Sequence, residues 1–428
     1  MTILLIFVLM GMFICMGIPI AFALGITSLG FLTFVTKVPL IVIVQRLFTG
    51  VDSFTLLAVP LFIFVGILMN STSISEKIVN LSIALVGHLK GGLSAVNIVA
   101  SMFFAGISGT SMADTAAIGG LMIPAMIKKG YKADFTAAVT ASSSTIGIII
   151  PPSVPMVLYG VFVGISVTKL FITGIIPGIF IGLGLILVSS IISHREGYRS
   201  ETTFSFKRLW QTFIGALPAL FLPVIILGGI MGGIFTPSEA GAVAVIYVLI
   251  LGFFLYRDLN LKKLYRALKD AVLLTGSVLI IIAVASLLGW VFAYAKIPQA
   301  LVSPVLHITK SPIVFMWIAS LILIIAGTFL HGTAMLVIVI PLFLPIVSQL
   351  GINPLHFAMV VMICWGIGQQ TPPVGSALYV TCTLADVDMG ELTRANIPFI
   401  SVLLVILAGV IHFPQFFVYF ILKLLRLM

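Results

Sequence analysis

A double proline that occurs twice, each time within an apolar segment long enough to cross a membrane, constrains the fold most. The two copies are Pro151-Pro152 and Pro372-Pro373. Proline breaks a helix because it has no amide hydrogen and clashes with the preceding turn. Unwound backbone in lipid loses its hydrogen bonds, so such breaks survive only where protein buries them or where they line a watery site. Two breaks at matching places indicate a secondary transporter built from an internal repeat.

A glycine–threonine motif precedes each double proline. Gly109-Thr110-Ser111-Met112 stands in the first copy and Gly332-Thr333-Ala334-Met335 in the second, and the spacing to the double proline differs by two residues. The motifs lie near the centres of two apolar segments, 91–127 and 311–349. The arms of the first segment are near the lower limit of about 17 residues for a crossing. We therefore expect two re-entrant hairpins whose tips stop within the membrane.

Composition places the whole chain in the membrane. Of its 428 residues, 61% are hydrophobic and 8% are charged, whereas a soluble domain carries about 25% charged residues. Most stretches between charged clusters reach the roughly 20 residues that a transmembrane helix needs. The net charge of +10 comes from Lys and Arg in short loops, as membrane orientation requires, and does not indicate nucleic-acid binding. The chain is predicted to be an all-α polytopic membrane protein.

The positive-inside rule orders the topology. With the N-terminus outside, residues 2–36 cross first as one long run with a kink at Pro19, 53–70 cross outward and 75–90 cross back. The first hairpin then enters from the cytoplasm and the second from the outside, so the two repeats are inverted. The basic residues placed in the cytoplasm are Lys128, Lys129, Lys132, Arg195, Arg199, Lys207, Arg208, Lys262, Lys263, Arg266 and Lys269.

The later crossings follow from the same rule. They are expected at 133–165, 167–193, 209–231, 238–256, 271–294, 353–384 and 397–424. The last crossing leaves Lys423 and Arg426 outside, against the rule. Short amphipathic stretches at 206–213 and 261–269 are expected to lie flat in the cytoplasmic interface, with Val38–Thr49 as a third such arm; plain helical linkers are the alternative.

The predicted organisation has five parts. Residues 1–90 form N-terminal scaffold helices and an arm, and 166–270 form further scaffold and interfacial helices. The first transport repeat, 91–165, is a hairpin followed by a broken helix, and the second, 271–384, is a linking helix, a hairpin and a broken helix. Residues 385–428 form a C-terminal helix.

Each break is predicted to bind one cation. Free carbonyl groups and hydroxyls at broken helices are hard oxygen ligands that can coordinate a dehydrated Na⁺. Several ligands act through the backbone, so their side chains need not be polar. The first predicted site consists of Ser108, Gly109, Gly147, Ile150 and Ser153. The second consists of Gly327, Gly332, Gly368, Thr371 and Val374. Interhelical hydrogen bonding by the Ser/Thr cluster is the alternative reading.

Polar residues near the tips and breaks are the predicted substrate contacts, because half-helix N-termini there attract anionic groups. They are Thr110, Ser111, Ser144, Thr333 and Gln369. An unpaired charge in the bilayer costs roughly 2.5–3.5 kcal/mol, so Asp114 caps the first hairpin or supports an ion site, directly or indirectly. His331 at the second tip binds substrate, senses protons or caps the arm.

Five segments carry a resemblance to a known family. They are GISGTSMADTAAIGG at 106–120, IIIPPSVP at 148–155, PGIFIG at 177–182, FTPSEAGAVA at 235–244 and TPPVGSALYV at 371–380. Together they resemble the large membrane subunit of tripartite ATP-independent periplasmic (TRAP) transporters over nearly the whole chain. Many members of that family have an acidic residue near the position of His331-Gly332, which is a departure here.

The resemblance implies an elevator-type transporter coupled to Na⁺ in the bacterial inner membrane, with no other cofactor and no enzymatic activity. Its substrate would be an organic acid such as a sialic acid or a C4-dicarboxylate. Its partners would be a separate small membrane subunit of four helices and a periplasmic substrate-binding protein.

Three alternatives remain open from the sequence. One is a divalent-anion/Na⁺ symporter that works without a soluble partner, and another is a channel. The third, an intramembrane hydrolase, lacks an evident catalytic set. The sequence also lacks a GxxxxGK[ST] motif, the usual sign of a nucleotide-binding loop, which leaves an ion gradient as the expected energy source.

Overall fold

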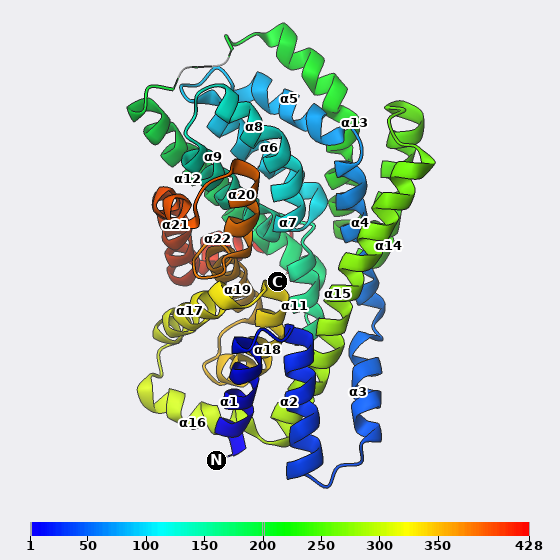
Figure 1. The fold of residues 1–428 in the computed structure, drawn as a ribbon, viewed down its shortest axis with the longest axis vertical. Coiled ribbons are helices and arrows are strands. Elements are labelled where there is room, and N and C mark those ends of the chain that lie inside the picture. Colours follow the sequence, from blue (N-terminus) through cyan, green and yellow to red (C-terminus); the bar gives the residue numbers. More distant parts are fainter. Residues whose placement is uncertain (1, 199, 201, 428) are drawn as a thin grey trace.

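The computed structural model describes residues 2–198, 200 and 202–427, and every regular element in this part of the chain is helical (Figure 1). Within it, seven helices are long and apolar enough to cross a bilayer, or up to nine if each of two bent helix pairs forms one span. This confirms a multi-pass, all-helical membrane protein. Arg199, expected in the cytoplasmic cluster, lies outside the described residues.

The N-terminal apolar run is two helices, not the single one expected over 2–36. α1 (Thr2–Cys15) and α2 (Ile20–Val35) pack side by side (Figure 1). Gly17 has a φ of 79°, which suits glycine, and Pro19 lies just before α2. These two residues let the chain turn back where composition alone shows an unbroken run.

The arm expected at Val38–Thr49 is a separate helix, α3 (Ile41–Val51), set at 59° to the helical segment Phe54–Asn70. That segment consists of the short η1 (Phe54–Leu57) and α4 (Ala58–Asn70). The crossing expected at 75–90 is wrong. α5 (Ile74–Val86) has 13 residues, about 20 Å of helix, while the hydrocarbon core is about 30 Å thick.

The first repeat follows the predicted order of hairpin and broken helix. α6 (Gly92–Ser108) forms the first arm of the hairpin. The second arm consists of α7 (Ser111–Asp114), a π-helical turn η2 (Thr115–Gly119) and α8 (Gly120–Lys128). The broken helix consists of α9 (Ala133–Ser144), α10 (Ile146–Ile149) and α11 (Val154–Val163), with a 42° bend at the double proline.

The second repeat has the same design. Its hairpin is α17 (Pro312–Phe329) and α18 (Gly332–Gln349), and its broken helix is α19 (Pro354–Gly368) and α20 (Ser376–Ala385). Both double prolines have a cis peptide bond between the two rings. The two predicted hairpins and two broken helices are therefore confirmed.

Long helices surround the repeats. They are α12 (Val167–Arg195), α13 (Phe206–Met231), α14 (Pro237–Ile250) with the π-helical η3 (Leu251–Leu255), α15 (Leu261–Tyr294) and the shorter α16 (Ile297–Ile308). The amphipathic stretches at 206–213 and 261–269 are not separate flat helices, because they form the first turns of α13 and α15. α15 also runs unbroken across residue 270.

The C-terminal segment is shorter than the crossing expected at 397–424. α21 (Met389–His412) ends two residues before Pro414, and the short helices α22 (Pro414–Phe417) and α23 (Phe420–Leu424) follow. The Phe417 ring packs against Gly409, and both short helices contact α12. The chain therefore turns back onto the bundle after His412. Lys423 and Arg426 consequently do not lie at the outer end of a straight crossing, where they were expected from the sequence.

The two hairpins enter from opposite ends of the molecule. The open end of the α6–α8 hairpin lies near α5 and the α12–α13 loop at the top of Figure 1, whereas α16, which leads into the second hairpin, lies at the bottom. Lys132 after α8 forms a 2.7 Å ion pair with Glu196 after α12, which joins two of the basic loops. The inverted arrangement of the repeats is thereby confirmed.

Candidate functional site

The first hairpin tip is hydrogen-bonded to the first helix break. The Val154 amide donates to the Gly109 carbonyl oxygen at 3.0 Å. Gly109 has a φ of 65°, and a methyl group on it would lie 2.8 Å from the Pro152 carbonyl oxygen. A side chain at this position would therefore force tip and break apart.

The other residues of the first predicted ion site lie in the same contact. A methyl group on Gly147 would lie 3.1 Å from the Thr110 carbonyl oxygen. The Ser153 hydroxyl accepts a hydrogen bond from the Met156 amide at the start of α11 and donates to the Ile148 carbonyl. Ser108 and Ser153 are fully buried. Ile150 has extended backbone within the break and packs against Gly178 of α12.

The second tip and break are hydrogen-bonded in a similar way, although through positions that do not correspond exactly to those of the first repeat. The Val374 amide donates to the Thr328 carbonyl oxygen at 3.2 Å, as Val154 does to Gly109. Gly327 and Gly368 meet so closely that a methyl group on Gly368 would lie 2.7 Å from the Gly327 Cα. The Thr371 hydroxyl donates to the Ile367 carbonyl at 2.8 Å. Thr328 was not expected at this site, because its contribution is a backbone oxygen that leaves no mark in the sequence.

Gly332 does not belong to this group. It starts α18 and faces the Trp365 ring, so the pairing of Gly332 with Gly109 is wrong. The structural equivalents are the N-cap residues Thr110 and His331 and the C-cap residues Gly109 and Leu330. The sequence separation between the two members of each pair equals that between Pro151 and Pro372, so the tips and the breaks follow the same alignment of the repeats. The two-residue difference in motif spacing arose because the second glycine–threonine lies inside a helix rather than at the tip.

A partly open cavity lies between the two tips and the two breaks, with a volume of about 70 Å³. Its walls come from both repeats and from two surrounding helices, α4 and α15. The lining residues are Ile63, Thr110, Ser111, Met112, Ile148, Val154, Pro155, Leu158, Leu274, Val278, His331, Thr333, Trp365 and Gln369. Equivalent positions of the two repeats face each other here, as Thr110 and His331 do, which places the cavity at the symmetry axis of the inverted pair.

Four of the five predicted substrate residues line this cavity, namely Thr110, Ser111, Thr333 and Gln369. The Gln369 amide nitrogen donates to the Ser111 hydroxyl oxygen at 2.9 Å, so a side chain of the second break holds the first tip. Ser144 is outside the cavity. Its hydroxyl lies 2.9 Å from that of Ser111 and therefore positions Ser111 from behind.

The two supporting residues differ in position. His331 lines the cavity beside the Trp365 ring, with 6.4 Å between ring centroids, and its side chain makes no capping hydrogen bond. Asp114 lies away from the cavity, fully buried at the start of the π-helical turn. Ser101 is beside it, yet neither Asp114 carboxylate oxygen has a hydrogen bond of regular geometry within the described residues.

A buried polar cluster joins the two broken helices behind the cavity. The Gln370 side chain contacts the hydroxyls of Ser142 and Thr145 and the Asn396 amide. All four residues are fully buried. Gln370 is a polar residue within a segment long enough to cross the membrane, which is costly unless it has partners. Asn396 of α21 did not, because nothing in its local sequence points to α19.

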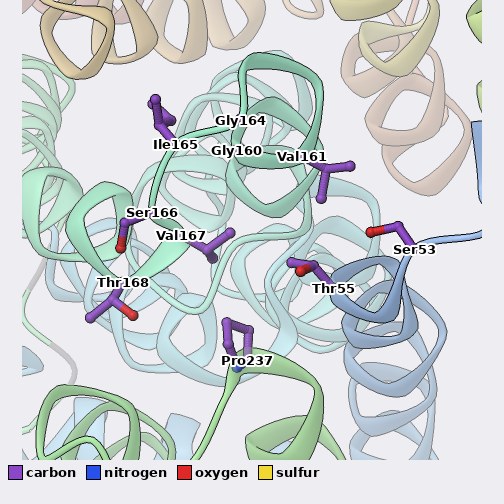
Figure 2. A pocket seen from close by; sticks show the side chains of 10 residues that line it. All are labelled: Ser53, Thr55, Gly160, Val161, Gly164, Ile165, Ser166, Val167, Thr168 and Pro237. Atoms are coloured by element: carbon purple, nitrogen blue, oxygen red, sulfur yellow. The ribbon is translucent and has the colours of Figure 1, made fainter.

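A larger, open hollow of about 390 Å³ lies at the start of α12 and α14 (Figure 2). Figure 2 shows Thr55, Val167 and Pro237 facing it. The hydroxyl of Ser238, next to Pro237, donates to the Phe54 carbonyl at 2.7 Å and holds one rim. α12 runs from this hollow to the basic loop that contains Glu196, so the hollow is on the side of the molecule opposite that loop.

Comparisons with known proteins agree with this architecture. Residues 6–416 match the model of the tripartite ATP-independent periplasmic transporter, DctM component. The chain is 39% identical to the sialic acid TRAP transporter large permease protein SiaM of Vibrio cholerae, over 94% of each chain. It is 36% identical to the C4-dicarboxylate TRAP transporter large permease protein DctM of the same species, over 97% of this chain and 96% of that one.

A crystal structure of the YdaH transporter of Alcanivorax borkumensis has the same fold, with a TM-score of 0.63 at 15% sequence identity, over 98% of this chain and 99% of that one. The matched relatives are transporter permease subunits, not enzymes. The chain belongs to the DctM family, the large membrane permease subunits of TRAP transporters.

Proposed function

We propose that this chain drives Na⁺-coupled uptake of an organic acid across the bacterial inner membrane. The observation that carries the proposal is the matched contact of tip and break in both repeats, Val154 to Gly109 and Val374 to Thr328. Each contact brings unwound backbone and buried hydroxyls together within the membrane. Oxygen-only sites of this kind suit a hard cation such as Na⁺, and the donor groups present fit it.

The substrate site is the cavity between the tips. Ser111, Thr110 and Gln369 offer hydroxyl and amide groups to a carboxylate. The start of α7, which Thr110 caps, adds unpaired backbone amides. A bound Na⁺ at each neighbouring break would offset the negative charge of the substrate, which couples the two kinds of binding.

The proposed movement is of the elevator type. The repeats form most of the cavity wall, whereas Ile63, Leu274 and Val278 come from α4 and α15. We assign α15 to the scaffold as a whole, in place of the division at residue 270 expected from the sequence, because it is one unbroken helix. These three apolar side chains offer no hydrogen bonds that would have to break when the repeats slide past them. A substrate held by the repeats could thus move along the scaffold and reach the other side.

The relatives' names describe large permeases of tripartite transporters. We therefore propose two partners for this chain, a small membrane subunit and a periplasmic protein that delivers the substrate. The open hollow beside Pro237 is on the side expected to face the periplasm, away from the basic loops.

The test is uptake of a radiolabelled acid into proteoliposomes that contain the chain with its small subunit and binding protein. Ser108→Ala, Ser153→Ala and Thr371→Ala should each raise the Na⁺ concentration needed for half-maximal uptake. Ser401→Ala is the matched control, because Ser401 is exposed on α21 and bonds only within its own helix. Unchanged Na⁺ dependence in all three variants would refute the ion sites. Full uptake without the binding protein would instead favour a partner-independent symporter.

A further inference from the structure

The polar groups of the cavity between the tips are few and uncharged except for the titratable His331. They come from Thr110, Ser111, His331, Thr333 and Gln369, together with the indole N–H of Trp365. No Lys, Arg, Asp or Glu is among the described residues that line it. The hydroxyl of Ser111 is already held by Gln369 and Ser144, so the free hydrogen-bonding capacity is smaller than the residue count suggests.

The rest of the cavity wall is apolar. Ile148, Val154 and Leu158 face it from the first broken helix, and the indole of Trp365 faces it from the second. The scaffold closes the cavity with the aliphatic side chains of α4 and α15. The repeat symmetry sharpens the contrast, because Ile148 occupies the position that corresponds to Gln369. One side of the axis therefore offers an amide where the other offers a hydrocarbon chain.

From this division we infer the substrate class: a monocarboxylate with an aliphatic or aromatic body, preferred over dicarboxylates and polyhydroxylated sugar acids. The inference rests on the proposed function, because it assigns the substrate of that same site. The carboxylate lies at the hydroxyls of Thr110 and Thr333 and the Gln369 amide. The apolar body lies against Ile148, Leu158 and Trp365.

Physical costs disfavour the other two classes. No Lys or Arg among the described lining residues would pair with the second carboxylate of a dicarboxylate, so at the apolar wall that group would lose water and depend on the neighbouring Na⁺ ions alone for a partner. Each hydroxyl of a sugar acid that met the aliphatic wall would lose its hydrogen bonds to water without replacement. One such loss lowers affinity by about five- to a hundredfold. The cavity volume of about 70 Å³ also favours a small body, since ligand pockets usually measure about 300–1,000 Å³.

The experiment measures binding to the permease complex itself, so that selection by the periplasmic protein does not intervene. The purified chain with its small subunit is heated in Na⁺ or in choline with 4-methylpentanoate, succinate or N-acetylneuraminate. We expect 4-methylpentanoate to raise the unfolding temperature in Na⁺ at concentrations at least about tenfold lower than the other two acids. An equal or stronger response to succinate or N-acetylneuraminate overturns the substrate class and leaves the proposed function intact. A lack of Na⁺-dependent response to all three acids overturns both.

Two substitutions on one helix assign the preference to the cavity wall. Val278→Thr exchanges a methyl group for a hydroxyl in the cavity, and Val272→Thr makes the same exchange on the exposed face of α15, where Val272 is 62% exposed. We expect Val278→Thr to weaken 4-methylpentanoate binding about five- to tenfold and Val272→Thr to leave it unchanged. Should Val278→Thr unfold without ligand, Ile63→Thr on α4 tests the same wall. Equal binding by a folded wall variant and the control overturns the assignment.

Discussion

Gln370 and Ser142 are 228 residues apart in the sequence, yet the Gln370 Oε1 and Ser142 Oγ atoms lie 2.8 Å apart in the centre of the molecule. Their contact joins the two broken helices at a depth where neither side chain can reach water. Asn396 of α21 closes the cluster with an amide contact to Gln370 at 3.2 Å.

Replacement of Gln370 by Leu should destabilise the protein. The change removes the shared partner of the Ser142 and Thr145 hydroxyls and of the Asn396 amide, although Ser142 still donates to the Asn396 side-chain oxygen at 2.7 Å. A buried group left unsatisfied costs about 1–3 kcal/mol. Interhelical hydrogen bonds in membranes average about 0.6 kcal/mol, so we expect a total loss of about 2 kcal/mol rather than the full sum. Thermal unfolding of the detergent-solubilised chain measures it. Gln45→Leu on the exposed face of α3 is the control, and an equal loss there would contradict a specific role for the cluster.

Gly109→Ala should disrupt the first tip. The alanine methyl group would meet the Pro152 carbonyl, and a φ of 65° is unfavourable for alanine, by about 1–2 kcal/mol. We expect uptake to fall by at least about tenfold in the proteoliposome assay. Gly120→Ala in α8 is the matched control, because a methyl group there meets nothing within 4 Å and alanine favours helix. A Gly109→Ala variant with normal uptake would show that the tip need not seat against the break.

The Asp114→Asn substitution should distinguish the effect of the carboxylate charge from the effect of the side-chain shape. The amide keeps the size of the carboxylate and removes a charge whose burial is costly, so expression and unfolding temperature should be maintained or rise. If Asp114 supports a cation through its charge, half-maximal uptake should require roughly three- to tenfold more Na⁺, as expected for loss of a charge some way from the ion. Substrate affinity at saturating Na⁺ should stay the same. Unchanged Na⁺ dependence together with a lower unfolding temperature would assign Asp114 a purely structural role.

The ion pair of Lys132 and Glu196 predicts a response to alkaline pH. The hydrogen bond and charge of Glu196 raise the pKa of Lys132 above its usual value. The pair's contribution to stability is therefore fully present below the unfolded lysine pKa of about 10.4 and is lost as the pH rises through the higher folded value. Glu196→Gln should remove this alkaline component from a plot of unfolding temperature against pH. The effect should be small, because both side chains are accessible to solvent, and should fade in high salt. A component that survives both changes must come from another group.

Much of the fold could be predicted from the chain because prolines and charges act locally. The double prolines located both breaks, and the hairpin motifs located both opposed hairpins. Errors arose where composition looks the same for different structures. The run over 2–36 is apolar on both sides of Gly17, so only the positive φ there reveals the turn. The stretches at 206–213 and 261–269 have an amphipathic pattern that suits both a flat helix and the first turns of a long one.

The candidate site was predictable for side chains and less so for backbone. Thr110, Ser111, Thr333 and Gln369 could be identified because polar groups are costly in lipid. Thr328 could not, because its carbonyl oxygen is common to every residue type. Gly332 was matched to Gly109 by residue identity, whereas the helix caps show which positions are equivalent in the structure. Ser144 was predicted to contact the substrate but lies behind Ser111, since a sequence does not show which of two neighbouring hydroxyls faces a cavity.

The hydrogen bond from Gln369 to Ser111 also bears on how such a chain could arise. Each repeat contributes one residue to this bond, and both repeats line the cavity, so a single repeat contains only part of the binding surface. A half-length ancestor would therefore have needed a second copy of itself, inserted in the opposite direction, before it could hold a substrate. Gene duplication and fusion would then have joined in one chain two copies that previously had to associate as separate molecules.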